Sequence, residues 1–388
     1  MASRAERTYL GEWWWTVDRW LIAATGLLMI CGIVAGLAAS PAVADKLGLQ
    51  SFHFVNRQAA YLALSCAVLL GASLLSPRHV RRAALVMFTV FLAMIIATLF
   101  IGQEIKGARR WLSLGGITVQ PSEFIKPAFV IMAAWAFAEG TRRKDMPATI
   151  LAILMLPAVV IPLAMQPDVG QTMLISAVWC GLFFIAGLHW FWVAGLGGLG
   201  FTGMLAAYKF APHVRARVDK FLAGSEGGGQ GQFQVDTALE SITSGGWLGK
   251  GPGEGTIKRI LPDSHTDFIF AVTAEEFGIF ACMALALIFA FAVLRALYIA
   301  RSSEDAFCRL AGAGLAMLFG FQASINMAVN LHLMPPKGMT LPFVSYGGSS
   351  MISLALGMGF LIAVTRKRPR SLIAEPISAP ESRALAAA

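Results

Sequence analysis

The residues best suited to chemistry stand at the end of a long polar stretch, from about residue 213 to residue 267. It closes with the run Leu261–Phe268, in which His265 and Asp267 precede an apolar segment. A carboxylate at this place can act as a general base or bind a metal ion. Asp also opens helices as a cap, so a structural role is the simpler alternative. The 11 glycines among the 32 residues from Gly224 to Gly255 favour chemistry, because they let backbone approach a bulky ligand closely.

Charged residues flank this carboxylate on both sides. Lys258 and Arg259 precede it, and their cations would attract either lipid phosphates or a pyrophosphate leaving group. Glu275 and Glu276 follow two turns into the apolar segment, and two adjacent carboxylates near the end of a membrane helix are candidates for a function. Glu276 could equally pair with a basic residue of a neighbouring helix. Within the polar stretch, residues 233–242 have a helical spacing of apolar residues and predict an amphipathic helix resting on the outer membrane interface.

Three further sets of residues combine charge with apolar surroundings. Glu123 and Lys126 lie three apart on one helical face and can pair, either for function or only to orient that helix. Asp168 precedes another apolar run, and its simplest role is to cap that helix. Arg110 and Trp111 suit an interfacial anchor, or else a site in which an aromatic face meets a sugar and Arg meets phosphate.

The elements that must position these residues are membrane helices. With 57% hydrophobic and 14% charged residues, the chain is too apolar for a soluble protein of 388 residues. We therefore expect an all-α polytopic membrane protein of about ten transmembrane helices, with one long extracytoplasmic loop between the seventh and eighth. The predicted spans are 20–39, 58–75, 83–102, 121–139, 148–165, 170–187, 190–209, 269–294, 307–330 and 345–364.

Basic residues predict the orientation, because Lys and Arg in short loops remain cytoplasmic. With the N-terminus inside, the inner segments carry 17 basic residues and the short outer loops carry 6. We expect cytoplasmic segments at 1–19 and 366–388, the latter disordered, around a membrane domain at 20–365 whose 210–268 loop is extracytoplasmic. The net charge of +9 is spread beside helix ends, as topology requires, so we expect no nucleic acid partner. The five cysteines form no Cys-x-x-Cys pair, which argues against a disulfide framework or thiolate metal site.

Six segments, taken in chain order, resemble the SEDS family of shape, elongation, division and sporulation proteins, which includes RodA and FtsW. The segment around Trp247 is more similar to the FtsW branch than to the RodA branch. The matching segments are Gly107–Leu112, Gln120–Lys126, Gln166–Thr172, Gly245–Gly255, Pro262–Glu276 and Lys337–Ser350.

This resemblance implies a peptidoglycan glycosyltransferase that polymerises lipid II into β-1,4 glycan during septal synthesis at the bacterial cytoplasmic membrane. The family's essential carboxylate maps onto Asp267, as general base or as ligand of a divalent cation, Mg or Mn. Substrate-binding positions are expected at Arg110, Trp111, Glu123, Lys126, Asp168, Lys258, Arg259 and His265. The implied partners are undecaprenyl-pyrophosphate-linked glycan, a class B penicillin-binding protein (an FtsI-like transpeptidase) and other division proteins.

The reaction needs one carboxylate, because the transfer inverts the anomeric carbon and pyrophosphate leaves without a general acid. Three alternatives remain open. A lipid II flippase would suit buried charges and glycine-interrupted helices, although no inverted repeat is visible. A RodA-like elongation polymerase would use the same chemistry, and a scaffold would only recruit division proteins.

Overall fold

The computed structural model describes residues 9–105, 108–114, 117–143, 147–187, 190–210, 212, 215, 219 and 230–367. The chain divides into two units, one formed by Met1–Val17 with Arg366–Ala388 and the other by Asp18–Thr365. In the first, α1 (Tyr9–Thr16) ends at Thr16, whose hydroxyl accepts a hydrogen bond of 2.9 Å from Arg366 Nε. Most of the predicted tail at 366–388 and the run Gly224–Gly229 lie outside the described residues. All further description concerns the second unit.

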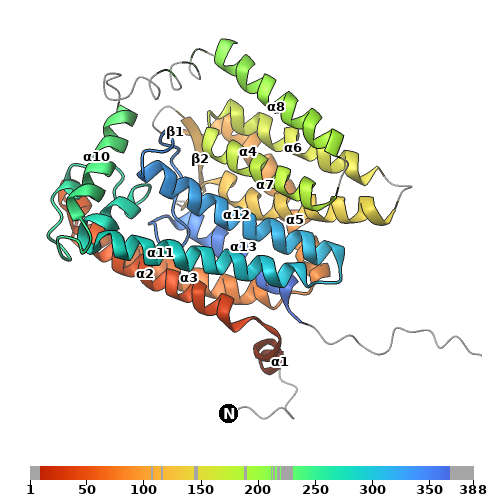
Figure 1. Cartoon of the computed structure of the whole chain (residues 1–388), viewed down its shortest axis with the longest axis horizontal. Coiled ribbons are helices and arrows are strands. Elements are labelled where there is room, and N and C mark those ends of the chain that lie inside the picture. The colour runs from red at the N-terminus through yellow and green to blue at the C-terminus, as the bar shows by residue number, and fades with distance from the viewer. Residues whose placement is uncertain are drawn as a thin grey trace, which may run out of the picture. The chain divides into compact units, whose positions relative to one another are not determined.

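Each of the ten predicted spans coincides with a helix, which confirms the polytopic helical class (Figure 1). Among the residues that the structure describes, seven of these helices are long and apolar enough to cross a membrane by themselves. The ten are α2 (Arg19–Lys46), α3 (His53–Ser73), α4 (Pro77–Ile101), α5 (Pro121–Arg142), α6 (Ala148–Met165), α7 (Val169–Ile185), α8 (Trp190–Phe210), α11 (Ile269–Arg301), α12 (Ala306–Asn330) and α13 (Gly348–Thr365).

Helix α12 is the centre of the packing. It lies against α5, α7, α11 and α13, while α13 also packs on α3, and α11 also packs on α2. Its central position follows from its many small residues, among them Ala311, Gly312 and Gly314, because small side chains let neighbouring helices approach closely. An ion pair also joins α11 to α2. Arg295 Nη2, near the end of α11, lies 2.6 Å from Asp18 Oδ2 at the start of α2.

The connector between α4 and α5 folds into a small antiparallel sheet that the sequence did not predict. Its strands β1 (Gln103–Ile105), β2 (Ala108–Leu114) and β3 (Ile117–Val119) pair in the order β1-β2-β3. Ala108 and Leu112 are buried on one face of β2. Because side chains alternate along a strand, Arg110 points to that same face and Trp111 to the opposite one.

The long loop contains the predicted helix, α10 (Gln230–Gly245), which ends where Gly246 adopts a positive φ of 59°. Leu239 on this helix is 37% exposed, and the position of the helix at the outer interface stays a prediction. Its apolar residues Val235, Ala238 and Ile242 are buried, and the helix packs on α11. The Ser241 hydroxyl also donates to the carbonyl of Ala271 at 3.2 Å, so α11 gives α10 both apolar and polar partners.

The loop then enters a break in α11 at Gly278, whose φ is 81° and ψ is 176°. The broken helix leaves backbone groups that a bilayer cannot satisfy, and the loop satisfies them. Lys250 N donates to the carbonyl of Glu275 at 2.9 Å, and Ile279 N donates to the carbonyl of Gly246 at 3.0 Å. Cβ atoms at Gly245, Gly249 or Gly278 would strike facing backbone, which explains part of the loop's glycine content.

The connectors predicted to lie outside meet one another at one end of the bundle, as a chain that crosses back and forth requires. The Lys258 ammonium donates to the carbonyl of Ala38 at the far end of α2. A Cβ on Gly170, at the start of α7, would lie 2.9 Å from the carbonyl of Lys337 between α12 and α13. In Figure 1, β2 and α10 both lie toward this end.

Candidate active site

Asp267 lies in a tight turn that immediately precedes α11. The carbonyl of Asp263 accepts hydrogen bonds from the backbone N–H groups of Thr266, Asp267 and Phe268 at 3.1, 3.1 and 3.3 Å. Asp263 reaches this geometry with a positive φ of 53°. The residue at the helix cap is Phe268, so Asp267 stands one position before it and the cap interpretation does not describe its placement.

The side chain of Asp267 is partly exposed and faces the connector between α12 and α13. Its Oδ2 atom lies 3.7 Å from the position that a Cβ on Gly338 would occupy. The half-buried Lys337 precedes Gly338, and its carbonyl lies against Gly170 at the start of α7. The structure thus brings Asp267, the Lys337 segment and the start of α7 together from three distant parts of the chain.

Arg110 and Asp168 form the neighbouring charged pair. Their Nη1 and Oδ1 atoms are 3.7 Å apart, and Arg110 Nη2 donates to the carbonyl of Pro167 at 2.6 Å. Asp168 stands at the start of α7, but its side chain makes no capping hydrogen bond. Burial raises the pKa of the Asp168 carboxyl above its ordinary value of 3.8, and the Arg110 cation opposes that rise.

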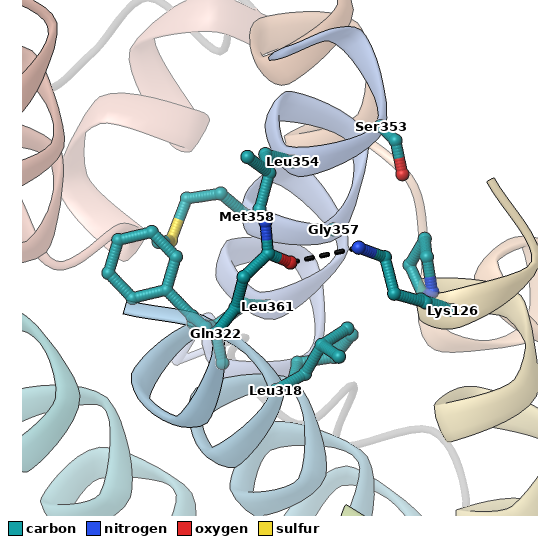
Figure 2. A pocket seen from close by; sticks show the side chains of 11 residues that line it. Lys126, Leu318, Gln322, Ser353, Leu354, Gly357, Met358 and Leu361 are labelled. Atoms are coloured by element: carbon teal, nitrogen blue, oxygen red, sulfur yellow. Dashed lines mark hydrogen bonds between the residues drawn. The ribbon is translucent and has the colours of Figure 1, made fainter. Parts of the chain in front are cut away.

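Glu123 and Lys126 pair inside the helix bundle, as their spacing predicted, with Glu123 Oε2 and Lys126 Nζ 2.8 Å apart. Gln171 Nε2 donates to Glu123 Oε1 at 2.6 Å, and Lys126 Nζ donates to Gln322 Oε1 at 2.9 Å. Figure 2 shows Lys126 and Gln322 reaching toward one another from α5 and α12. A cavity of about 20 Å³, room for one water molecule, lies beside them. Both charges therefore have defined partners, which keeps the ionised pair tolerable in an apolar bundle.

Arg110 and Trp111 do not line one surface. Because they are adjacent in β2, Arg110 reaches Asp168 while Trp111 occupies the other face of the strand. The adjacent Arg109 pairs with Glu104 on β1 at 3.5 Å, with both side chains more than half exposed.

His265 belongs to an aromatic group two residues before Asp267. Its ring centroid lies 4.7 Å from that of Phe54 on α3 and 5.4 Å from that of Tyr346. The carbonyl of His265 also accepts a hydrogen bond of 3.0 Å from Tyr346 N. These contacts fix the turn that carries Asp267, and sequence reasoning did not single out Phe54 or Tyr346 for that role.

Lys258 and Arg259, which the sequence interpretation assigned together to a pyrophosphate, differ in their surroundings. Lys258 is 3% exposed, forms an ion pair with Glu276, and donates to the carbonyl of Gly253 at 3.3 Å. Glu276 thus finds its cation in the loop rather than on a neighbouring helix. Arg259 is exposed. The difference arises because the loop folds down onto α11, so that Lys258 meets a buried carboxylate.

Glu275 organises the same segment without contacting the site. Its carboxylate accepts backbone hydrogen bonds from Thr256, Ile257 and Lys258 at 2.7, 2.8 and 3.0 Å. These three N–H groups belong to the first turn of a short 3₁₀ helix, Ile257–Arg259, and the N-terminal end of such a turn favours an anion. Glu275 and Glu276 therefore hold the loop in place.

A family model for cell cycle proteins, named for FtsW, RodA and SpoVE, matches residues 18–370. The chain belongs to this family. Its SEDS resemblance and its closer similarity to FtsW are confirmed, because curated relatives carry the FtsW name. A probable peptidoglycan glycosyltransferase FtsW from Caulobacter vibrioides is 46% identical over 368 residues, covering 95% of this chain and 94% of the relative. One from Legionella pneumophila is 34% identical, covering 93% and 94%.

Solved structures agree with the family. A chain of a peptidoglycan synthase complex that coordinates polymerisation and crosslinking is 27% identical, with a TM-score of 0.74 over 90% of this chain and 97% of that chain. The rod shape determining protein RodA of Thermus thermophilus is also 27% identical, with a TM-score of 0.66 over 91% and 97%. This SEDS chain is a multi-pass membrane protein with the family's helical fold.

Three residues of this SEDS chain escaped the sequence analysis although they contact the site. Gln322, Asn326 and Asn330 are buried in α12, and each donates a hydrogen bond to the backbone near Asp267 or in the connector that faces it. A signal was present, since three amides spaced by four residues inside an apolar span lie on one face. Neutral amides carry a weaker functional signal in a sequence than ionisable residues do.

In the part of the chain that the structure describes, no three His, Cys, Asp or Glu side chains converge on a possible metal site. The cysteines Cys31, Cys66, Cys180, Cys282 and Cys308 are all unbridged, as expected. Any cation at Asp267 would thus take most of its ligands from substrate and water, a common arrangement for magnesium.

Proposed function

We propose that this protein is a peptidoglycan glycosyltransferase that polymerises lipid II and uses Asp267 as its general base. The observation that carries the proposal is the convergence at Asp267. A partly exposed carboxylate faces Gly338, and the preceding residue, Lys337, lies against the start of α7, at the end of the bundle where Arg110 also lies. The names of the FtsW relatives supply the reaction class.

The transfer joins the 4-hydroxyl oxygen of an acceptor GlcNAc to the anomeric carbon of a muramyl residue. Asp267 takes the hydroxyl proton as the new C–O bond forms. The bond from the anomeric carbon to the pyrophosphate oxygen breaks on the opposite side, and its electron pair leaves with undecaprenyl pyrophosphate. Inversion converts the α-linked donor into a β-1,4 link, so a single carboxylate suffices.

The leaving pyrophosphate is a weak base and needs positive charge rather than a proton. We assign this role to Arg110, with 24% of its side chain exposed, and to Arg259, which is exposed. Lys126 and Lys258 are already engaged by buried carboxylates, so we assign them to structure. Their ion pairs orient the site without touching the leaving group.

As the alternative to its role as general base, Asp267 would hold a divalent cation, Mg or Mn. Asp267 offers one carboxylate, and Mg²⁺ in nucleotide-handling sites is held by one or two carboxylates together with substrate phosphates. When bound, the cation would add positive charge beside the departing pyrophosphate.

We place the protein in the bacterial cytoplasmic membrane at the division septum, with both termini cytoplasmic. The partners that we propose are a class B penicillin-binding protein, other division proteins and the lipid-linked glycan. The FtsW relatives support the septal role, and the similar chain in a peptidoglycan synthase complex supports the transpeptidase partner.

Reconstituted vesicles test this function against the flippase alternative. Purified protein with the transpeptidase partner should convert labelled lipid II in the outer leaflet into glycan strands. Translocation of the label without polymer would instead establish a flippase. In cells depleted of the native division polymerase, the gene should restore septation, whereas restored rod shape alone would assign it to elongation.

A further inference from the structure

Three buried amides form a stripe along α12. Gln322, Asn326 and Asn330 are spaced by four residues and therefore share one helical face, and they are 1%, 2% and 0% exposed. Amide groups inside an apolar helix are costly unless their polar atoms are hydrogen bonded. We call these three residues the amide stripe.

The outer two members hold the backbone of Asp267. Its carbonyl accepts from Asn326 Nδ2 at 2.9 Å and from Asn330 Nδ2 at 3.0 Å. Two further hydrogen bonds of these amides reach the surrounding elements. Asn326 Nδ2 also donates to the carbonyl of Met339 at 2.6 Å, and Asn330 Oδ1 accepts from Ala271 N at 3.1 Å. Two side chains thus join the end of the loop, the first turn of α11 and the α12–α13 connector.

The inner member extends the same framework to the charged pair in α5. Gln322 Oε1 accepts from Lys126 Nζ at 2.9 Å (Figure 2). Its Nε2 donates to the carbonyl of Thr340 at 3.1 Å. Thr340 follows Met339 directly, so the inner and outer members hold neighbouring carbonyls of one connector. Since α-helices rise about 1.5 Å per residue, the eight residues from Gln322 to Asn330 separate the two contacts by about 12 Å along the helix.

We propose that Asn326 and Asn330 are positioning residues that fix the Asp267 carboxylate against the Gly338 segment, and that Gln322 ties Lys126 to the same connector. The inference rests on the proposed role of Asp267 as base. A carbonyl held by two rigid donors fixes the Cα beside it, and with it the direction of the side chain. Misplacing a reacting group by about 1 Å costs on the order of 100-fold in rate, so loss of either donor should appear in turnover.

The test compares Asn326→Leu and Asn330→Leu with the wild type in lipid II polymerisation. The matched control is Trp179→Phe, which removes another buried tertiary hydrogen bond, from Trp179 Nε1 to the carbonyl of Ala152 at 2.9 Å, away from Asp267. We expect each Leu variant to lower kcat by roughly 10- to 100-fold while KM for lipid II changes little. Trp179→Phe should keep kcat at an equal or greater loss of thermal stability.

Hydrogen exchange supplies a readout that general destabilisation would not produce. In the Leu variants, peptides covering residues 263–272 should exchange faster, while peptides from α6 and α7 should not. Asn326→Ser retains a shorter donor, so it should recover part of kcat and serves in place of Asn326→Leu if that variant does not fold. Unchanged kcat, or a rise in KM at constant kcat, would overturn the positioning role.

Asp267→Asn separates this inference from the proposed function. If Asp267→Asn is inactive and the Asn326 and Asn330 variants keep full kcat, the positioning role alone is wrong. If Asp267→Asn remains active, the assignment of the base is wrong and the positioning role falls with it.

Discussion

At the residue scale, buried charges in this protein serve two different ends. The pair Glu275 and Glu276 binds the loop backbone and Lys258, and so fixes the loop on α11. Asp168 instead meets a partly exposed arginine, Arg110, beside the site. Both kinds look alike in sequence, because each is an ionisable residue at the edge of an apolar run. Only the identity of the partner separates a structural charge from one that can act on substrate.

Substitution of the adjacent residues Lys258 and Arg259 by Met should therefore affect different properties, stability for Lys258 and polymerisation for Arg259. Lys258→Met leaves Glu276 buried without its cation, and breaking a buried pair costs about 3–5 kcal/mol, so the thermal unfolding midpoint in detergent should fall clearly. Arg259→Met removes an exposed charge, so it should leave the midpoint near that of the wild type while lowering polymerisation. A stable but inactive Lys258→Met protein would show that Lys258 serves the substrate.

Replacing Asp168 by Asn should make the protein more stable at neutral pH but less active. Burial raises its folded-state pKa above 3.8, so the folded protein binds the proton more tightly than the unfolded chain does. This group's contribution to stability is thus complete at low pH and is lost as pH rises from about 4 through the folded pKa. Asn cannot ionise, so Asp168→Asn should keep this stability at neutral pH. The variant should therefore have a higher unfolding midpoint at neutral pH and lower polymerisation. A lower midpoint at neutral pH would mean that the ion pair with Arg110 stabilises the fold.

At the element scale, the break in α11 explains why one long loop can carry a fixed site. The turn from Gly246 to Gly251 satisfies the backbone groups that Gly278 leaves unpaired, while α10 covers the first turns of the same helix. Loop and helix therefore form one element, from which Asp267 emerges at a defined place.

Glycine at the break should be irreplaceable. Gly278→Ala forces an L-residue to a φ of 81° and places its Cβ against the backbone at Trp247, so folded protein should be lost or greatly reduced. Gly71→Ala is the matched control, because Gly71 lies in α3 with open space around it and alanine favours helix by about 1 kcal/mol. Yield and unfolding midpoint after purification measure both. Equal stability of the two variants would contradict the role given to the break.

The elements differ in how far the sequence alone predicts them. The helices were found because hydropathy over about 20 residues is a local property, and α10 because apolar residues recur at helical spacing. The sheet β1-β2-β3 was missed because its short strands are specified by pairing. The break at Gly278 was missed because it depends on a segment about 30 residues earlier. The partner of Lys258 and the contacts of Asn326 also depend on distant segments, so the spacing of residues in the sequence could not predict them.

At the scale of the whole molecule, the connectors of the membrane domain build the site together. Arg110 comes from the connector between α4 and α5, Asp168 from that between α6 and α7, and Lys337 from that between α12 and α13. Alternate crossing places these segments on one side of the membrane. The basic residues predict that this side is the outer face, and we propose that lipid-linked sugars are polymerised there. The helices thus act as supports, while short connectors carry the chemistry.

The most direct test of this account is the polymerisation of labelled lipid II by purified Asp267→Asn protein with its transpeptidase partner. Asp263→Asn is the matched control, because it makes the same chemical change in the same turn, at a positive φ that Asn tolerates. Asp267→Asn should yield no glycan strands, since an amide cannot accept the hydroxyl proton, and Asp263→Asn should yield strands at close to the wild-type rate. Glycan strands from Asp267→Asn at the wild-type rate would contradict the account.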